Sequence, residues 1–390
     1  MKIAVMFGPL CLSGRGGSLD LANPRQDPKG LTGSEIGFIR LAECMRDAGH
    51  TVELIVKSPQ TEYGGMPVRP EPSGHYDAAL AINEPDLLRG VDAPIRALAC
   101  WLNDFSFARA GFDQHVDLYF SPSAEHMKQF SLHESWRRVE VTQQNPKGVE
   151  LFTMRPEKWS AVHLGCDPER YVGHGDKVPG KCIYASSPDR GLHHVLEQWP
   201  RIKKAAPHAT LHIFYRLAKW IQDLASVPYP FPPVEALRAR ALYINDALGR
   251  MRDPKWGITV HDSVSREELE REMASAECVT YPCDTVRWSE GFSCTLLEAC
   301  AARACPVTLE TDAFPDVYGG TVPMVARECI TEWGDLVIRA LKDDAWREIA
   351  NERCGLFADG KTWEVTATKM LQAMKARMVL GAQAMEHVQV

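Results

Sequence analysis

Residues 278–309, CVTYPCDTVRWSEGFSCTLLEACAARACPVTL, contain the pattern that decides the fold. The apolar run at 278–281 predicts a buried strand, the segment 293–304 has the spacing of a helix, and 306–309 predicts another strand. The loop between the first strand and the helix includes Ser-Glu-Gly-Phe-Ser at 289–293. A loop in this place lies at the carboxyl edge of a sheet, where α/β proteins bind their ligands.

The same strand–helix–strand order recurs along the chain. The strand at 2–7, the helix from Ser34 (expected N-cap) to Gly49 and the strand at 51–57 form a βαβ unit, which implies a parallel sheet. Further strands are expected at 78–82, 95–100, 116–120, 161–164, 182–186, 211–215 and 257–261, and further helices at 192–205, 234–252, 266–274, 331–342 and 362–378. We therefore expect an α/β protein with two Rossmann-like, doubly wound domains that face each other across a cleft.

The domain boundaries follow from a change in composition. The segment 172–181 is rich in Gly, His, Lys and Pro, which is typical of a linker. We expect an N-terminal, acceptor-side domain at 1–171 and a C-terminal, donor-side domain at 172–361. The final segment, 362–390, is expected to be a helix that crosses back to the N-terminal domain.

Composition narrows the classes of protein further. The chain has 390 residues, of which 45% are hydrophobic and 24% charged, as in ordinary globular proteins. Its net charge of −7 gives no electrostatic signature of nucleic-acid binding. The 12 cysteines include no C-x-x-C pair, which indicates free thiols in a reducing compartment. No apolar run is long enough to span a membrane, so we expect a soluble, cytoplasmic protein.

The loop and helix after 278–281 have the features of an anion site. Gly291 permits close backbone approach, and the first helical turn offers free N–H groups for phosphate oxygens. Glu298 lies one turn into the helix, within reach of a nucleotide diol, and Glu290 stands beside the phosphates. The alternative is a capped helix with surface glutamates. The residues expected to form the turn are Ser293, Cys294, Thr295 and Leu296.

At this point the sequence resembles a known family. Glu290-x7-Glu298 with Gly-Phe between, followed by Glu-Ala-Cys-Ala-Ala-x-x-Cys-Pro-Val, is similar to the nucleotide-sugar signature of retaining family-4 glycosyltransferases, which have the GT-B fold. Other segments resemble the family in the same order, from Gly33-Ser34-Glu35 onward. These further segments are 41–42, 48–52, 116–123, 163–171, 186–192 and 260–269.

The resemblance implies roles for individual residues. Glu290 would contact sugar hydroxyls, Glu298 the ribose, and Arg190 the leaving diphosphate, whose charge is the main electrostatic problem of the reaction. Glu290 and Arg190 are thus the candidate catalytic residues. The candidate donor-binding residues are Gly33, Ser34, Ser187, Arg216, Val264, Gly291, Phe292, Ser293, Cys294, Thr295, Leu296 and Glu298.

Three features depart from the family pattern. The family has a lysine as well as an arginine at the diphosphate, and here Arg216 is either its substitute or a surface arginine. In place of a histidine after the strand at 95–100, Asn103 and Asp104 either face the sugar or acceptor or form an Asx turn. The loop 8–32 is longer than a nucleotide site requires; it either shapes the acceptor side or is mobile.

The expected activity is that of a retaining glycosyltransferase of the hexosyltransferase type. It would move a sugar from a nucleotide diphosphate sugar, with UDP- and GDP-sugars as first candidates, to a hydroxyl of a saccharide, lipid-linked or small-molecule acceptor. No cofactor is expected, and the absence of Asp-x-Asp argues against the metal-dependent type. Two alternatives are a GT-B sugar-nucleotide epimerase or phosphorylase-like enzyme and a catalytically silent nucleotide-sugar-binding protein. Transfer to modified DNA is disfavoured by the net charge of −7.

Overall fold

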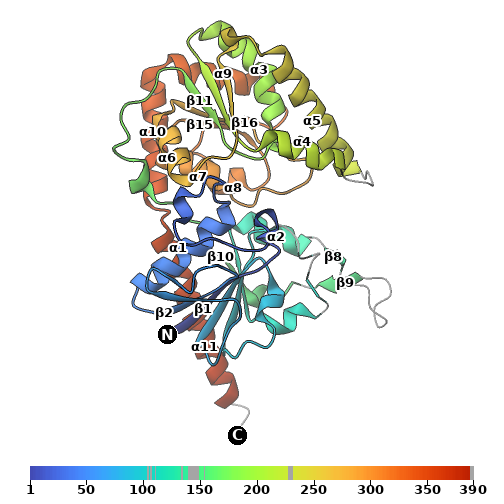
Figure 1. Ribbon diagram of the computed structural model, residues 1–390, viewed down its shortest axis with the longest axis vertical. Coiled ribbons are helices and arrows are strands. Elements are labelled where there is room, and N and C mark those ends of the chain that lie inside the picture. Colours follow the sequence, from blue (N-terminus) through green and yellow to red (C-terminus); the bar gives the residue numbers. More distant parts are fainter. Residues whose placement is uncertain are drawn as a thin grey trace. The chain divides into compact units, whose positions relative to one another are not determined.

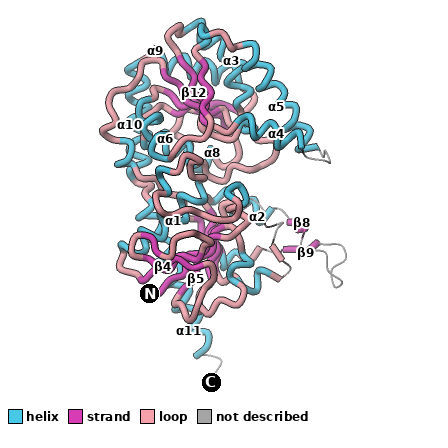
Figure 2. Tube along the Cα trace, in the orientation of Figure 1, coloured by secondary structure: helices cyan, strands magenta, loops and turns pink. Residues whose placement is uncertain are grey.

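The computed structural model describes residues 1–102, 105, 108, 109, 111–132, 135–138, 149–152, 154–226 and 232–386. The chain folds into two compact units, each with helices around a central sheet (Figures 1 and 2). Unit 1 comprises Met1–Pro24, Leu31–Gly165 and Trp363–Val390, and unit 2 comprises Arg25–Gly30 and Cys166–Thr362. The predicted α/β fold with two parallel sheets is confirmed.

Unit 1 is built on an eight-stranded sheet with the order β10-β7-β6-β5-β1-β2-β4-β3. All neighbouring strands are parallel except β3 and β4. Every residue of β5 is buried, as expected for a parallel strand covered on both faces. The strands are β1 (Lys2–Phe7), β2 (Thr51–Ile55), β3 (Glu62–Tyr63), β4 (Met66–Arg69), β5 (Ala78–Ile82), β6 (Arg96–Ala99), β7 (Leu118–Ser121) and β10 (Trp159–Ala161), and β8 (Ser135–Arg138) and β9 (Val149–Phe152) form a separate antiparallel pair.

The helices of unit 1 are α1 (Gly33–Asp47), α2 (Ala124–Leu132) and α11 (Trp363–Glu386). The prediction that Ser34 caps α1 is wrong. Thr32 is the N-cap, because its hydroxyl accepts the Glu35 N–H at 3.3 Å while the Glu35 carboxylate accepts the Thr32 N–H at 2.7 Å. The long C-terminal helix α11 packs along α1, where Arg40 pairs with Glu364 at 3.2 Å.

Unit 2 has a six-stranded, all-parallel sheet with the order β13-β12-β11-β14-β15-β16. Numbered along the chain, this is the 3-2-1-4-5-6 order of a Rossmann sheet. The strand order therefore reverses between β11 and β14. The strands are β11 (Lys181–Tyr184), β12 (Thr210–Phe214), β13 (Ile258–His261), β14 (Cys278–Tyr281), β15 (Pro306–Glu310) and β16 (Met324–Ala326).

The helices of unit 2 cover both faces of this sheet, with α3 and α5 on one side and α6 and α10 on the other (Figure 1). They are α3 (Leu192–Ala205), α4 (Leu217–Ser226), α5 (Pro232–Arg250), α6 (Arg266–Ser275), α7 (Cys294–Ala301), α8 (Phe314–Tyr318), α9 (Ile330–Lys342) and α10 (Asp344–Asp359). The two units also contain short 3-10 turns at Ser13–Arg15, Pro24–Gln26, Pro85–Leu88, Phe112–His115, Pro156–Lys158, Pro168–Tyr171, Pro188–Arg190 and Pro254–Trp256. Helix α7 ends before the predicted Ala304, because Arg303 has a positive φ of 51°.

Candidate functional site

The two loops at the strand-order reversal of unit 2 carry the predicted catalytic pair. One loop follows β11 and ends in Arg190, and the other follows β14 and contains Glu290. The Arg190 guanidinium forms an ion pair with the carboxylate of Glu290, whose side chain is buried. Carboxyl ends of adjacent strands at such a reversal form the usual ligand crevice of an open α/β sheet. The structure therefore brings together two side chains that the sequence places far apart.

The loop that holds Arg190 is fixed by close packing against the loop after β14. Gly191 has a φ of 108°, and a Cβ atom there would overlap the carbonyl of Pro282, so only glycine fits. Burial by itself lowers the pKa of Arg190, but Tyr281, Cys283 and Asp189 raise it to a net value above the usual range. The guanidinium is therefore positively charged.

Asp312 positions the backbone of Glu290. Its carboxylate accepts the N–H groups of Ser289 at 2.8 Å and Glu290 at 2.9 Å, and the hydroxyl of Thr285 at 3.0 Å. Asp312 lies just beyond β15 with a φ of 51°, and burial raises its pKa. Asp312 is not among the predicted site residues, although the polar Thr311-Asp312 pair directly after a buried strand is a usable sequence signal.

The amino end of α7 is held in an unusual backbone conformation. Its N-cap, Ser293, has a φ of 80°, a region that costs a non-glycine residue about 1–3 kcal/mol. The Ser293 hydroxyl accepts the Leu296 N–H at 3.3 Å, and its carbonyl accepts the hydroxyl of Tyr318 at 2.7 Å. The Thr295 hydroxyl donates to the Ala185 carbonyl at 3.1 Å, which ties α7 to the loop after β11. Helix amino ends favour anions because their first N–H groups lack carbonyl partners within the helix, but the Ser293 hydroxyl already takes the N–H of Leu296 here.

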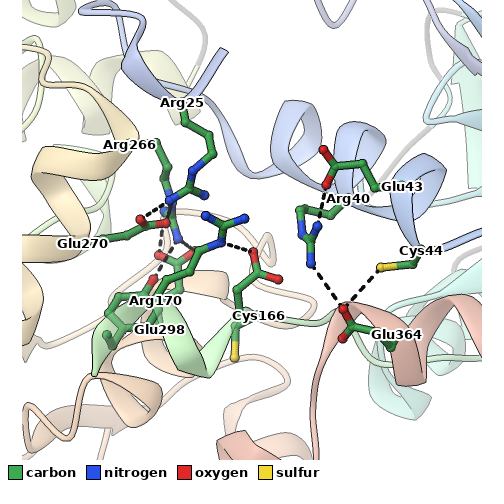
Figure 3. A network of polar contacts seen from close by, with 12 residues as sticks. Arg25, Arg40, Glu43, Cys44, Cys166, Arg170, Arg266, Glu270, Glu298 and Glu364 are labelled. Carbon is green, nitrogen blue, oxygen red and sulfur yellow. Dashed lines mark hydrogen bonds and ion pairs between the residues drawn. The ribbon is translucent and has the colours of Figure 1, made fainter. Parts of the chain in front are cut away.

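Glu298, the predicted ribose contact, is part of a buried charged cluster (Figure 3). Arg266 donates to both of its carboxylate oxygens, at 2.6 and 3.0 Å. The same guanidinium donates to Glu270 at 2.8 Å and to the hydroxyl of Tyr171 at 2.7 Å. Burial raises the pKa of Glu298, and the charge of Arg266 offsets only part of that effect. Glu298 is a predicted site residue, whereas its partner Arg266 is not.

Other predicted donor residues lie in unit 2 with fewer contacts. Arg216 is half-buried just beyond β12, and no hydrogen bond or ion pair joins its guanidinium to another residue that the structure describes. Val264 lies between β13 and α6, and its carbonyl oxygen is 2.7 Å from the position of a Cβ on Gly30. Ser187 donates its hydroxyl to Asp189. Phe292 is buried, and Gly291 and Cys294 lie on either side of the Phe292–Ser293 pair.

The remaining predicted residues lie in the other part of the chain. Gly33 and Ser34 form the first turn of α1 in unit 1, where the Ser34 hydroxyl accepts from the side chain of Asn83 at 3.2 Å. Asn103 and Asp104 lie outside the described residues, so their roles stay predictions.

A second cluster surrounds Asp284 in the loop after β14. The cluster contains Asp284, His193 and His194, whose side-chain oxygen and nitrogen atoms are of the kinds that bind metals. Among the residues that the structure describes, it is the only group of three or more such side chains close together. Both carboxylate oxygens of Asp284 already accept from arginines, from Arg240 at 2.7 Å and from Arg327 at 2.9 Å. Burial raises the pKa of Asp284, but the histidine and arginine partners together hold it well below its usual range. The cluster is thus an ion-pair centre.

Within the described ranges, no helix is both long enough and apolar enough to cross a membrane.

Comparison with known proteins gives matches in structure only. No protein-family model and no curated protein matches the sequence. Anabaena HepE in complex with UDP-glucose matches with a TM-score of 0.59 and 12% identity over 96% of this chain and 100% of that one. The α,α-trehalose 6-phosphate synthase from Burkholderia multivorans matches with a TM-score of 0.62 and 11% identity over 99% and 98%.

A third solved structure covers less of the chain. The UDP-forming α,α-trehalose-phosphate synthase from Burkholderia vietnamiensis has a TM-score of 0.52 and 13% identity over 76% of this chain and 70% of that one. At such identities a likeness describes the fold. The predicted GT-B class, with two Rossmann-like domains, is confirmed.

Proposed function

We propose that this protein is a retaining glycosyltransferase of family 4 and of the hexosyltransferase type. It transfers a sugar from a nucleotide diphosphate sugar to a hydroxyl acceptor. The observation that carries the proposal is the ion pair between Arg190 and Glu290 at the strand-order reversal of unit 2. The strained amino end of α7 on the same loop adds a second feature suited to a diphosphate.

Arg190 and Glu290 contact different parts of the donor. A guanidinium has five N–H donors, so Arg190 can hold Glu290 and still donate to phosphate oxygens as negative charge develops on the leaving diphosphate. Glu290, kept in place by Asp312, accepts hydrogen bonds from sugar hydroxyls. The Arg216 guanidinium makes no hydrogen bond or ion pair with another described residue. Arg216 supplies the second positive charge, in place of the family's lysine.

Retention is part of the proposal. If the leaving phosphate accepts the proton of the acceptor hydroxyl, the new bond forms on the face that the diphosphate leaves. In that mechanism the protein supplies charge and orientation rather than a covalent nucleophile. The proposal includes no metal or cofactor, because Arg190 and Arg216 supply positive charge and the chain has no Asp-x-Asp motif.

UDP-sugars are the first donor candidates. HepE was solved with UDP-glucose, and the Burkholderia vietnamiensis synthase is described as UDP-forming; both have the same fold as this chain. GDP-sugars are the second candidates. The acceptor is a hydroxyl of a saccharide, a lipid-linked sugar or a small molecule, and a cytoplasmic location completes the proposal.

The test measures release of the nucleoside diphosphate from a panel of UDP- and GDP-sugars with mixed acceptors. Wild-type protein should release nucleotide only when an acceptor is present, and Glu290→Gln and Arg190→Lys should lose that activity. Glu197→Gln and Arg201→Lys are matched controls, because these side chains are largely exposed and lie outside the site. The anomeric configuration of the product, read by NMR, tests retention.

Each alternative gives a different result in the same assay. A GT-B epimerase changes the donor sugar without an acceptor. A silent binding protein retains the donor without consuming it. Full activity in both site variants would refute the assignment of Arg190 and Glu290.

A further inference from the structure

A short segment from the N-terminal part of the chain, Arg25–Gly30, packs in unit 2. We name it the strap. Its first residue, Arg25, forms an ion pair with Glu270 of α6. At its last residue, Gly30, φ is 70° and a Cβ atom would lie 2.7 Å from the carbonyl oxygen of Val264. The first residue of the strap therefore contacts α6, and the last lies against the segment directly before α6.

Arg25 begins a series of four alternating charges that ends at Glu298 (Figure 3). Glu270 accepts from Arg25 through one carboxylate oxygen and from Arg266 through the other, at 2.8 Å. Arg266 in turn donates to both oxygens of Glu298. The Arg25 side chain is 25% exposed and that of Glu270 only 5%, so the series leads from the surface to a buried carboxylate. Two positive and two negative charges balance.

Arg266 has no freedom to turn in this arrangement. Its Nε donates to Glu270, both Nη atoms donate to Glu298, and Nη2 also donates to Tyr171 at 2.7 Å. A guanidinium is planar, so these bonds fix the plane of the Glu298 carboxylate. Each carboxylate oxygen has two lone pairs, and Arg266 occupies one on each. One lone pair on each Glu298 oxygen therefore remains available to accept a hydrogen bond from a hydroxyl.

We propose that Arg25 is a positioning residue for the nucleoside. Acting through Glu270 and Arg266, it orients Glu298 to accept hydrogen bonds from the 2′- and 3′-hydroxyls of the donor ribose. Without Arg25, Glu270 keeps a single cationic partner and draws Arg266 away from Glu298. The strap thus makes a segment of the N-terminal region a part of nucleotide recognition. This inference rests on the proposed function, since it assumes that unit 2 binds a nucleotide.

The test measures the ribose preference, defined as the Kd of the 2′,3′-dideoxynucleoside diphosphate divided by the Kd of the ribonucleotide. The probes are UDP and 2′,3′-dideoxy-UDP, followed by GDP and its dideoxy analogue, titrated calorimetrically into the full-length protein. Two hydrogen bonds to a charged carboxylate predict a wild-type preference of about tenfold or more. Arg25→Ala should reduce it to about threefold or less, and Arg25→Lys should restore part of it.

Lys29→Ala is the matched control, because Lys29 is an exposed cation of the same strap with no side-chain partner in the described structure. It should keep the wild-type preference. An Arg25→Ala protein that binds UDP with the full wild-type preference would overturn the inference and leave the proposed function intact. A wild-type protein that binds neither UDP nor GDP would contradict the proposed function itself. A general loss of folding would lower both affinities and leave their ratio unchanged, which separates it from positioning.

Discussion

Arg190 and Glu290 lie on two different loops of unit 2 and meet as an ion pair at the carboxyl edge of its sheet. A buried carboxylate requires a positively charged partner. The partner of Glu290 is Arg190, the side chain that we propose also binds the diphosphate. In the proposed function, the donor would therefore meet an arginine and a glutamate that are already in contact.

The first prediction concerns the coupling of Arg190 and Glu290. Glu290→Gln and Arg190→Lys should each lower kcat/KM by about 100- to 1,000-fold, because each removes one preorganised charge contact. The double variant should lose much less than the product of the two single effects, because residues that form a pair are not energetically independent. Steady-state kinetics of the four proteins measures this. Strictly additive losses would show that the two residues act separately.

The second prediction concerns Asp312. Asp312→Ala should lower the free energy of unfolding by about 1–3 kcal/mol, because it leaves the buried N–H groups of Ser289 and Glu290 without their acceptor. It should also lower kcat, since Glu290 loses its backbone support. Glu310→Ala, an exposed change at the end of the preceding strand, is the control. Urea unfolding and kinetics on the same samples test both effects, and an Asp312→Ala protein with normal kcat would contradict the positioning role.

The third prediction concerns the buried cluster around Arg266. Arg266→Ala leaves two buried glutamates, Glu298 and Glu270, without their shared partner and should destabilise unit 2 by about 3–5 kcal/mol. Arg201→Ala removes a surface pair with Asp335 and should cost about 1 kcal/mol or less. Chemical denaturation compares the two. Equal costs would mean that burial adds nothing to the Arg266 pairs.

The fourth prediction concerns pH and His126 in unit 1. His126 is fully buried beside Ser121, and burial lowers its pKa from 6.5 to about 4. The unfolded chain binds this proton more readily, so the stability that the neutral ring contributes is complete above pH 6.5 and is lost as the pH falls toward 4. The loss should approach about 3 kcal/mol. His126→Gln should flatten this part of the pH profile, and an unchanged slope would show that another group titrates.

The sequence predicted those elements whose apolar pattern is strong. The helix at Leu192–Ala205 and the strand at Cys278–Tyr281 have the predicted bounds, because an amphipathic face and a short buried run are local signals. Helix α10 was missed, since Ile349 and Leu356 on it are 66% and 67% exposed and blur its periodicity. Its position depends on packing against α7 and α9, which no local window contains.

The candidate site was predicted in part for a similar reason. Glu290, Glu298 and Arg190 stand in recognisable spacings next to predicted strands. Arg266 and Asp312 belong to no recognisable motif, although Asp312 does follow a predicted strand. Only the folded chain shows that Arg266 contacts Glu298 and that Asp312 binds the backbone of Glu290, because each pair of partners comes from different segments of the chain.

The most direct measurement is a thermal-shift titration of the purified protein with UDP, GDP, ADP and TDP and their common sugar conjugates. A ligand at 100 times its Kd adds about 2.7 kcal/mol to the stability of the protein that binds it. We predict a rise in Tm with one base, UDP being the first candidate, that is lost in Glu298→Ala and retained in Glu197→Gln. No rise in Tm with any nucleotide, or the same rise in Glu298→Ala, would contradict a nucleotide-sugar site in unit 2.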